Sequence, residues 1–349
     1  MKLAMAAFTA RGAALGRQLA AALTAEGEEC SLTVPARLAP ALGLPAMDSL
    51  ADWTAREFAR ADGLVFVGAC GIAVRAIAPH VKDKLTDPAV AAVDEAGRWV
   101  VPLLSGHVGG ANDLARRIAA FTGGQAAVST ATDVNGLFAV DQWAARQGFT
   151  IEDRTAAKAI SAALLAGETV GFASEFPVDS PLPKGVTEGE ANIGFSVTAK
   201  TDPLPFGTGL RLVPQVLRLV PQVLRLGIGC RRGTTEEAIA AAVDTALAEN
   251  GFSAKAVAGV GTIDLKKDEA GLLAFCAHRG WKLDCYSAEE LLRAEGEFTP
   301  SDFVKGVTGV DNVCERSAVM GGGQLVIRKR AANGVTVAAA LLPLRLTFE

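Results

Sequence analysis

The stretch VVPLLSGHVGGANDLARRIAAF, residues 100–121, decides the fold, because an apolar run, a glycine-rich turn and an amphipathic segment follow one another directly. Residues 100–104 carry no charge, which predicts a strand buried on both faces of a parallel sheet. Asn112 stands where a helix would begin, and apolar residues then recur at helical spacing. The stretch therefore predicts a strand, a tight turn and a helix.

The turn at residues 105–110, SGHVGG, is the first candidate site. Its glycines permit positive φ angles and a close approach of the backbone to a bound group. The free N–H groups of the helix start, with their partial positive charge, suit a carboxylate or phosphate. His107 is one of only three histidines in the chain, and its glycine neighbours favour exposure to a ligand. The alternative is a tight turn that merely packs the helix on its strand.

A second glycine turn precedes this stretch. Residues 63–68 predict another buried strand, and residues 69–77 open a helix that carries Gly71 and Arg75. Ligands of open α/β sheets bind outside the carboxyl ends of parallel strands. We therefore expect the two turns to converge on one crevice.

Polar segments on either side of the central stretch supply further candidates. Lys82 and Lys84 either hold acidic groups of a substrate or belong to a solvated loop. Asp133 and Asn135, in a polar loop after the central helix, are expected to line the same crevice.

Composition narrows the class of protein. The chain has 349 residues, 50% of them hydrophobic and 21% charged, with a net charge of −4, which is typical of a globular protein and does not favour nucleic acid as a partner. The six cysteines form no CxxC pair and no metal-ligand spacing, which indicates reduced thiols. The longest uncharged run, residues 63–74, is too short to span a membrane. We expect a soluble, cytoplasmic protein.

Residue patterns divide the chain into three parts. An N-terminal open α/β sheet domain with helices on both faces is expected over residues 1–148, and a proline-rich middle region and linker over 149–223. A separate C-terminal three-layer α/β/α domain is expected over 224–349. The heptapeptide LVPQVLR occurs at 212–218 and again at 219–225, and because a seven-residue insertion would reverse the faces of a strand, we expect irregular pairing there.

The C-terminal part holds the last candidates. Cys230, Arg231 and Arg232 follow a predicted strand and precede a helix start. Paired arginines at such a turn suit a polycarboxylate, although a buried thiol beside solvated charges is the alternative.

Taken together, these motifs resemble those of the cobalt-precorrin-5A hydrolases of anaerobic cobalamin (vitamin B12) biosynthesis. The resemblance rests on GACGIAVRAIAPHVKDKLTDPAVAAVDEAG (68–97), VVPLLSGHVGGANDLARRIA (100–119), TATDVNGLFAVD (130–141), LGIGCRRGTTEEAI (226–239), GTIDLKKDEAGL (261–272) and YSAEEL (286–291). The doubled LVPQVLR and the leucine-rich tail after Ala340 are departures from the family.

The resemblance implies hydrolysis of a δ-lactone on ring A of a corrinoid, with loss of acetaldehyde. His107 is then the candidate general base, because imidazole titrates near neutrality, and Ser105 is a weaker candidate nucleophile. The amides of residues 109–111 are candidates for holding an oxyanion. The predicted substrate-binding residues are Gly71, Arg75, Lys82, Lys84, Gly106, Gly109, Gly110, Asn112, Asp133, Asn135, Cys230, Arg231 and Arg232.

Two other classes of function are weighed against this one. A corrinoid-intermediate carrier without catalysis would bind the same substrate but release no acetaldehyde. A nucleotide-binding protein would need a dinucleotide or P-loop fingerprint, and neither is present. No cofactor or metal site of the chain's own is expected, since cobalt arrives with the substrate. A homodimer and transient contact with neighbouring pathway methyltransferases are the remaining expected partnerships.

Overall fold

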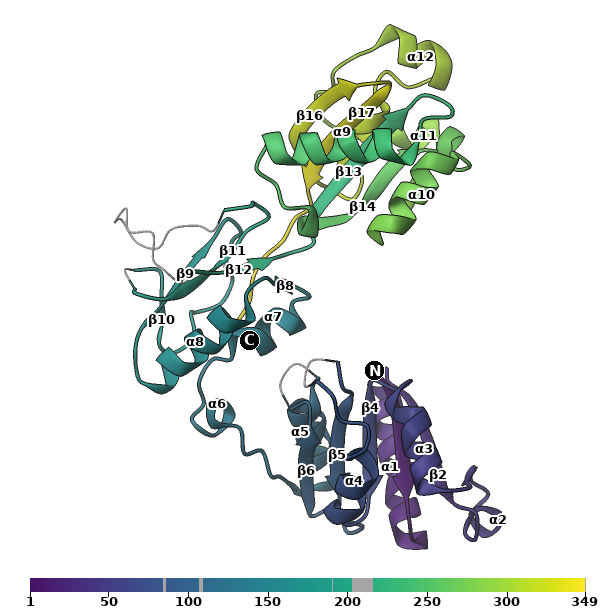
Figure 1. The fold of residues 1–349 in the computed structure, drawn as a ribbon, viewed down its shortest axis with the longest axis vertical. Coiled ribbons are helices and arrows are strands. Elements are labelled where there is room, and N and C mark those ends of the chain that lie inside the picture. Colours follow the sequence, from purple (N-terminus) through teal and green to yellow (C-terminus); the bar gives the residue numbers. More distant parts are fainter. Residues whose placement is uncertain (84–85, 107–108, 190, 203–215, 349) are drawn as a thin grey trace. The chain divides into compact units, whose positions relative to one another are not determined.

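The computed structural model describes residues 1–83, 86–106, 109–189, 191–202 and 216–348 (Figure 1). Internal contacts divide the chain into two units, Met1–Leu137 and Phe138–Glu349. Helix α7 (Val140–Arg146) falls within the bounds 1–148 expected for the first domain, and it packs with α8 (Arg154–Leu165) and β8 (Thr150–Ile151) of the second unit. None of the helices among the described residues is long and apolar enough to cross a membrane.

The first unit is a seven-stranded sheet with the order β3-β2-β1-β4-β5-β6-β7. Its strands are β1 (Lys2–Ala7), β2 (Glu29–Pro35), β3 (Ala46–Met47), β4 (Gly63–Val67), β5 (Ala89–Val93), β6 (Trp99–Leu104) and β7 (Gln125–Ala126). Its helices are α1 (Ala10–Ala25), α2 (Ala39–Leu42), α3 (Leu50–Phe58), α4 (Cys70–Ile77), α5 (Ala111–Thr122) and α6 (Ala131–Val134). Most neighbouring strands run parallel, as the pattern of alternating strands and helices predicts.

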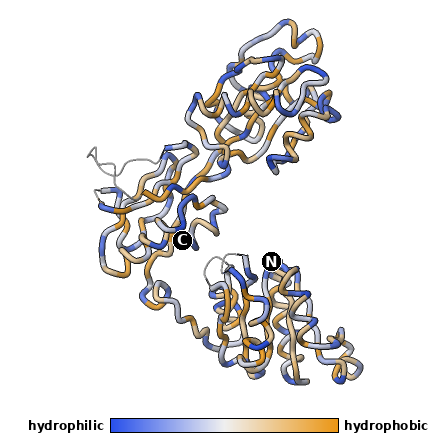
Figure 2. The backbone as a smooth tube through the Cα atoms, viewed as in Figure 1, coloured by the Kyte–Doolittle hydropathy of each residue, from blue (hydrophilic) through white to orange (hydrophobic). Residues whose placement is uncertain are grey.

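Two apolar clusters lie on the two faces of this sheet. On one face, Leu19 of α1 and Ile118 of α5 pack against strand residues such as Val65. On the other face, Trp53 of α3 and Ile77 of α4 pack against alternate residues of the same strands. Apolar residues accordingly follow the strands at the centre of the unit (Figure 2). Helices therefore cover both faces, which confirms the expected α/β class.

Strand β6 differs from our prediction. It runs antiparallel to β5, with Val90 opposite Leu104 and Val93 opposite Val100. Of its six residues only Val100 is fully buried, so β6 is not a strand buried on both faces. An uncharged run of residues does not encode strand direction, because the same apolar surface is buried whichever way the strand runs.

The second unit begins with a small sheet of five strands in the order β10-β9-β11-β12-β8. Besides β8, its strands are β9 (Val170–Ser174), β10 (Val186–Thr187), β11 (Gly194–Val197) and β12 (Val216–Val220). An aromatic cluster packs against it, in which Phe348 near the end of the chain stacks on Trp143 with ring centroids 4.7 Å apart. The leucine-rich C-terminal tail therefore returns to this sheet.

The remainder of the second unit is a sheet with the order β15-β14-β13-β17-β16 and its helices. The strands are β13 (Leu224–Cys230), β14 (Val257–Ile263), β15 (Leu283–Tyr286), β16 (Gln324–Ala332) and β17 (Val335–Leu341). The helices are α9 (Glu236–Glu249), α10 (Ala270–Arg279), α11 (Ala288–Leu292), α12 (Asp302–Thr308) and α13 (Val313–Val319), with short 3₁₀ turns at Ala254–Ala256 and Asp264–Lys266.

Helix α13 lies directly on the backbone of this sheet. A Cβ atom at Gly227 of β13 would lie 1.7 Å from the carbonyl oxygen of Cys314, and one at Gly261 of β14 would lie 2.6 Å from that of Ser317. Because no side chain would fit, the two glycines allow the close packing of α13. Helix α9, on the near side in Figure 1, packs on β16 and β17.

The two copies of LVPQVLR contribute to different sheets. Val216–Val220, which spans the junction of the copies, forms β12 and pairs with β11 in continuous register. After Pro221, the end of the second copy enters β13, where the pairing with β14 shifts register between Leu224 and Arg225. The expected irregularity is thus present at the start of β13, while residues 212–215 lie outside the described residues.

Candidate functional site

The loop between β6 and α5 is shaped by contacts of its own backbone. Ser105 adopts a φ of 55°, in the left-handed region that few residues other than glycine occupy. A Cβ atom at Gly109 would lie 2.4 Å from the Ser105 Cβ and 2.9 Å from the Ser105 carbonyl oxygen. Gly110, at a φ of 85°, begins α5 as its N-cap. Glycine is therefore required at position 109 by space and at position 110 by backbone conformation.

The first amides of α5 are already hydrogen-bonded within this loop. The Ala111 N–H donates to the Ser105 carbonyl at 3.1 Å, and the Asn112 N–H donates to the Gly106 carbonyl at 3.0 Å. The Ala111 amide, one of the three amides expected to hold an oxyanion, thus donates to a backbone carbonyl in the structure. These two amides at the start of the helix therefore close a backbone turn.

The Ser105 side chain joins the loop to the segment before β5. Ser105 is 7% exposed, and its hydroxyl donates to the Asp87 carbonyl oxygen at 2.8 Å. A backbone carbonyl cannot accept the proton as a general base, so this hydrogen bond does not activate Ser105 as a nucleophile. The geometry gives Ser105 a positioning role.

Asp87 in turn organises the lysine segment. Its carboxylate accepts from the backbone N–H groups of Lys82 at 2.8 Å and Asp83 at 3.1 Å. The hydrogen bonds of Ser105 and Asp87 thus join the β6–α5 loop to the backbone of Lys82, whose side chain is exposed. Lys84 and His107 lie outside the described residues.

A buried amide connects the start of α5 to the loop that follows β7. Asn112 is 2% exposed, and its Nδ2 donates to Thr130 Oγ1 at 2.8 Å and to Asp133 Oδ2 at 3.0 Å. A Cβ atom at Gly106 would lie 2.7 Å from the Asn112 Oδ1, so Gly106 leaves room for this side chain. Asp133 also pairs with Arg116, and that hydrogen bond raises the pKa of the guanidinium.

The predicted residues of the first unit gather at two edges of the sheet. Ser105, Asn112 and Asp133 share one edge with Lys82, since β6 runs antiparallel to β5. Gly71, at the start of α4, follows the carboxyl end of β4, beside Val93 at the opposite edge, and Arg75 lies in the last turn of that helix. The expectation that the two glycine turns converge on one crevice is therefore wrong.

Asn135 has a local role in the structure. Its side-chain Nδ2 donates to the Ala131 carbonyl at 2.8 Å, at the end of α6, and the residue is exposed. It therefore stabilises the short helix that follows Thr130.

In the second unit, a cavity of about 740 Å³ opens beside the end of β13. It is bordered by the turn after β13, by α12, by the start of α13 and by the β16–β17 hairpin. The predicted residues Cys230, Arg231 and Arg232 line it together with residues far away in the sequence, among them Leu265, Phe303 and Lys329.

The charges at this cavity are of one sign. Arg231, Arg232, Lys266 and Lys329 line it, and none of its described lining residues is acidic. Lys266 pairs with Glu269 at 3.2 Å, whereas Arg231, Arg232 and Lys329 form no ion pair within the described part of the chain. Burial raises the pKa of the Cys230 thiol, which keeps that thiol protonated and unreactive at neutral pH.

Backbone contacts place Arg231 at the cavity. Its N–H donates to the Gly334 carbonyl at 3.0 Å, and its Cδ lies 3.1 Å from where a Cβ of Gly334 would be. Asn333 and Gly334 both have positive φ, as a two-residue hairpin turn of type I′ requires. The side chain of Arg231 thus lies over a glycine at the tip of the β16–β17 hairpin.

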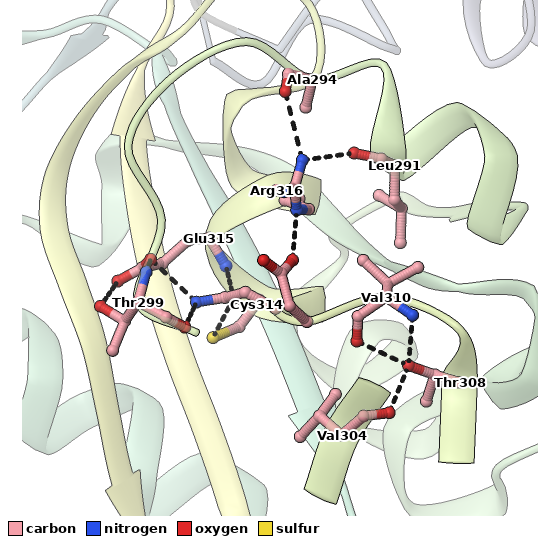
Figure 3. A network of polar contacts seen from close by, with 11 residues as sticks. Leu291, Ala294, Thr299, Val304, Thr308, Val310, Cys314, Glu315 and Arg316 are labelled. Atoms are coloured by element: carbon pink, nitrogen blue, oxygen red, sulfur yellow. Dashed lines mark hydrogen bonds and ion pairs between the residues drawn. The ribbon is translucent and has the colours of Figure 1, made fainter. Parts of the chain in front are cut away.

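A fully buried carboxylate stabilises the other side of the cavity (Figure 3). Glu315 accepts from the Thr299 N–H at 2.6 Å, from Asn312 Nδ2 at 2.8 Å and from the Lys329 N–H at 2.7 Å. The neighbouring Arg316 pairs with Asp311 at 2.9 Å and lowers the pKa of that carboxyl. Glu315 therefore joins the segment before α12 to α13 and β16.

Comparison with known proteins matches three successive parts of the chain to three family models. Residues 52–133 match the family model "Cobalamin synthesis G N-terminal", 138–214 match "Cobalamin biosynthesis central region" and 224–340 match "Cobalamin synthesis G C-terminus". The chain is 35% identical to the cobalt-precorrin-5A hydrolase of Priestia megaterium over 80% of this chain and 79% of that protein. It is 34% identical to that of Salmonella typhimurium over 96% of each chain.

The chain belongs to the cobalt-precorrin-5A hydrolase family. Within this family assignment, the N-terminal match contains the β6–α5 loop and the C-terminal match contains the cavity. The chain is also 31% identical to Protein CobE of Sinorhizobium sp., over 33% of this chain and 77% of that protein.

Several residues at the two sites escaped the sequence analysis of this family member. Asp87 and Thr130 accept hydrogen bonds in the first unit, and Phe303 and Lys329 line the cavity in the second. The Asn-Gly pair at 333–334 is a hairpin signal that could have located the cavity rim. Sequence offers no comparable signal for Phe303, whose role follows only from its position in the fold.

Proposed function

We propose that this chain is a cobalt-precorrin-5A hydrolase, which opens the ring A δ-lactone of cobalt-precorrin-5A with water and releases acetaldehyde to give cobalt-precorrin-5B. The observation that carries the proposal is the identity of 34–35% to two proteins of that name over 80–96% of the chain. The three family models, matched in order along the chain, support it.

The reaction requires a group that activates water, and His107 is our candidate for this general base. A histidine has an ordinary pKa of about 6.5, so it can accept a proton from water near neutral pH. The loop on both sides of this residue is held by hydrogen bonds, from Ser105 to Asp87 and from Asn112 to Thr130.

The proposed substrate carries its cobalt and its carboxylates with it, so the chain needs to supply cations and no metal of its own. Arg75, Lys82, Lys84, Arg231 and Arg232 stay our candidates for the substrate carboxylates. Homodimerisation and transient contact with pathway methyltransferases stay predictions, which gel filtration and cross-linking would test.

The test is acetaldehyde release from cobalt-precorrin-5A by the purified chain, with the His107→Ala variant assayed beside it. We expect release by the wild type and a rate lower by a factor of about 100 to 10,000 in the variant, the range for loss of a general base. Equal rates would move the base to another residue. Substrate binding without release by the wild type would favour a corrinoid carrier and contradict the proposal.

A further inference from the structure

The cavity beside β13 combines apolar side chains that are left exposed with cations that are left unpaired. Leu265, Phe303 and Val307 are 59%, 80% and 66% exposed, although all three are large hydrophobic residues. They lie on η2 (Asp264–Lys266) and on α12, so they come from separate parts of the sequence. Exposed apolar residues that gather at a cavity indicate a surface that is covered by a bound molecule.

The cations indicate the charge of that molecule. Arg231 and Lys329 line the cavity and form no ion pair among the described residues. Glu269 pairs with Lys266, and the charge of Arg232 also helps to lower the pKa of the Glu269 carboxyl. Glu315, next to the lining residue Cys314, is fully buried, and its oxygens accept hydrogen bonds from protein groups on three sides. The described lining of the cavity therefore carries positive charge only and complements a ligand with several free carboxylates.

Size and shape restrict the ligand further. The cavity volume of about 740 Å³ is in the range of roughly 300–1,000 Å³ that small-molecule sites occupy. A ligand that suits it has one broad apolar face for Leu265, Phe303 and Val307, and anionic groups at its edge for the cations.

We propose that this cavity binds a corrin ring in its free-acid form, with the apolar ring face on Leu265, Phe303 and Val307 and peripheral carboxylates on Arg231, Arg232 and Lys329. The ligand class rests on the proposed function, whereas the choice of free acid over amide rests on the unpaired cations. The cavity thus discriminates carboxylate corrinoids from amidated ones, because an amide leaves the cations without a counter-charge.

The test is equilibrium binding of two stable corrinoids to the full chain, followed by quenching of tryptophan fluorescence. Cobyrinic acid carries free carboxylates around the ring, and cobinamide carries amides in their place. We expect cobyrinic acid to bind at least about tenfold more tightly than cobinamide, with a difference that shrinks as salt is raised. Equal binding of the two, or no binding of cobyrinic acid, would overturn the proposal.

Matched variants locate the binding. Lys329→Gln and Arg231→Gln should each weaken cobyrinic acid binding by about three- to tenfold, whereas Arg330→Gln, at the next residue of β16 and outside the cavity lining, should not. Phe303→Ser should weaken the binding of both corrinoids, whereas Leu292→Ser, an exposed leucine of α11 that is also outside the lining, should leave it unchanged. Equal effects of test and control variants would contradict the assignment.

Two further measurements separate this inference from the proposed function. Acetaldehyde release by the wild type, with an unchanged KM in Lys329→Gln and Phe303→Ser, would keep the function and reject the cavity as its binding site. The predicted binding pattern without acetaldehyde release would keep the cavity and reject the hydrolase. If Phe303→Ser dissociates a dimer in sedimentation and leaves corrinoid binding unchanged, the apolar surface is an interface between copies of the chain.

Discussion

The loop between β6 and α5 is shaped by backbone contacts, whereas the cavity of the second unit is lined by side chains that the fold leaves exposed. In the loop, Gly109 touches Ser105, and amides of α5 close the turn. At the cavity, Phe303 and Lys329 belong to the lining, and the backbone of Lys329 is held by a hydrogen bond from its N–H to Glu315. One added methyl group should therefore disrupt the conformation of the loop, whereas single substitutions in the cavity lining should each weaken ligand binding by a smaller amount.

The largest effect on stability is expected at Gly227 of β13, where helix α13, which borders the cavity, lies against the backbone of the sheet. Gly227→Ala would place a Cβ 1.7 Å from the Cys314 carbonyl oxygen and 2.8 Å from the Ala318 nitrogen. Because helix α13 would have to move off the sheet, we expect a loss of about 3 kcal/mol or more in the free energy of unfolding. Urea denaturation monitored by circular dichroism measures it.

The control for this substitution is Gly306→Ala in α12, where an added Cβ has no neighbour within 4 Å. In an open helical position, alanine in place of glycine should be neutral or stabilise by about 0.5–1 kcal/mol. If Gly227→Ala were as stable as the wild type, the packing of α13 would not depend on its close approach to Gly227.

The second effect concerns activity. Gly109→Ala would bring a Cβ within 2.4 Å of the Ser105 Cβ, so the loop must change its course. We expect kcat/KM for acetaldehyde release to fall by about 100-fold or more, since a displacement of an ångström at a reacting group has that effect. In Gly110→Ala the added Cβ has no neighbour within 4 Å, and only the positive φ of 85° disfavours alanine. The loss of kcat/KM should therefore be smaller than in Gly109→Ala. A larger loss of kcat/KM in Gly110→Ala than in Gly109→Ala would show that the contact between residues 109 and 105 does not account for the effect.

The third effect separates two roles of one side chain. Ser105→Ala removes the hydrogen bond to the Asp87 carbonyl and should lower stability by about 1 kcal/mol. As a positioning residue, Ser105 should contribute about tenfold or less to kcat, whereas loss of a nucleophile would lower kcat by up to about a million-fold. Steady-state kinetics beside thermal unfolding would decide; a fall of the larger size restores Ser105 as the nucleophile.

The smallest effect is a dependence of stability on pH near the cavity. Glu269 accepts from the Gly233 N–H, and this hydrogen bond lowers the carboxyl pKa from its ordinary value of 4.5. Its stabilisation is therefore present above the unfolded-state pKa and is lost as pH falls through the folded-state pKa.

Glu269→Gln lacks this titrating group, so the stability difference from the wild type should be constant at neutral pH and close on acidification. Urea denaturation of both proteins at a series of pH values measures the difference. A difference that persists unchanged to acidic pH would show that the carboxylate charge is not what stabilises the turn after β13.

Local patterns predicted many elements of the fold correctly. The buried strand predicted over residues 63–68 is Gly63–Val67, and the helix after the glycine loop, Ala111–Thr122, begins beside the predicted Asn112. Apolar periodicity and capping residues act over a few neighbouring positions, so the sequence displays them directly. The shortest strands of the middle sheet, such as β10 (Val186–Thr187), were not predicted, because they contain too few residues to show a period.

By itself, the sequence determined the α/β class, the family and the loop in which His107 and Ser105 stand, because motifs and periodicity are properties of contiguous residues. Only the tertiary structure decided that β6 runs antiparallel to β5, which places the glycine turn of Gly71 at the opposite edge from Ser105. Only the tertiary structure brought Phe303 and Lys329 to the arginines after β13. Strand direction and contacts between distant elements are fixed by the burial of whole surfaces, which no local stretch of sequence encodes.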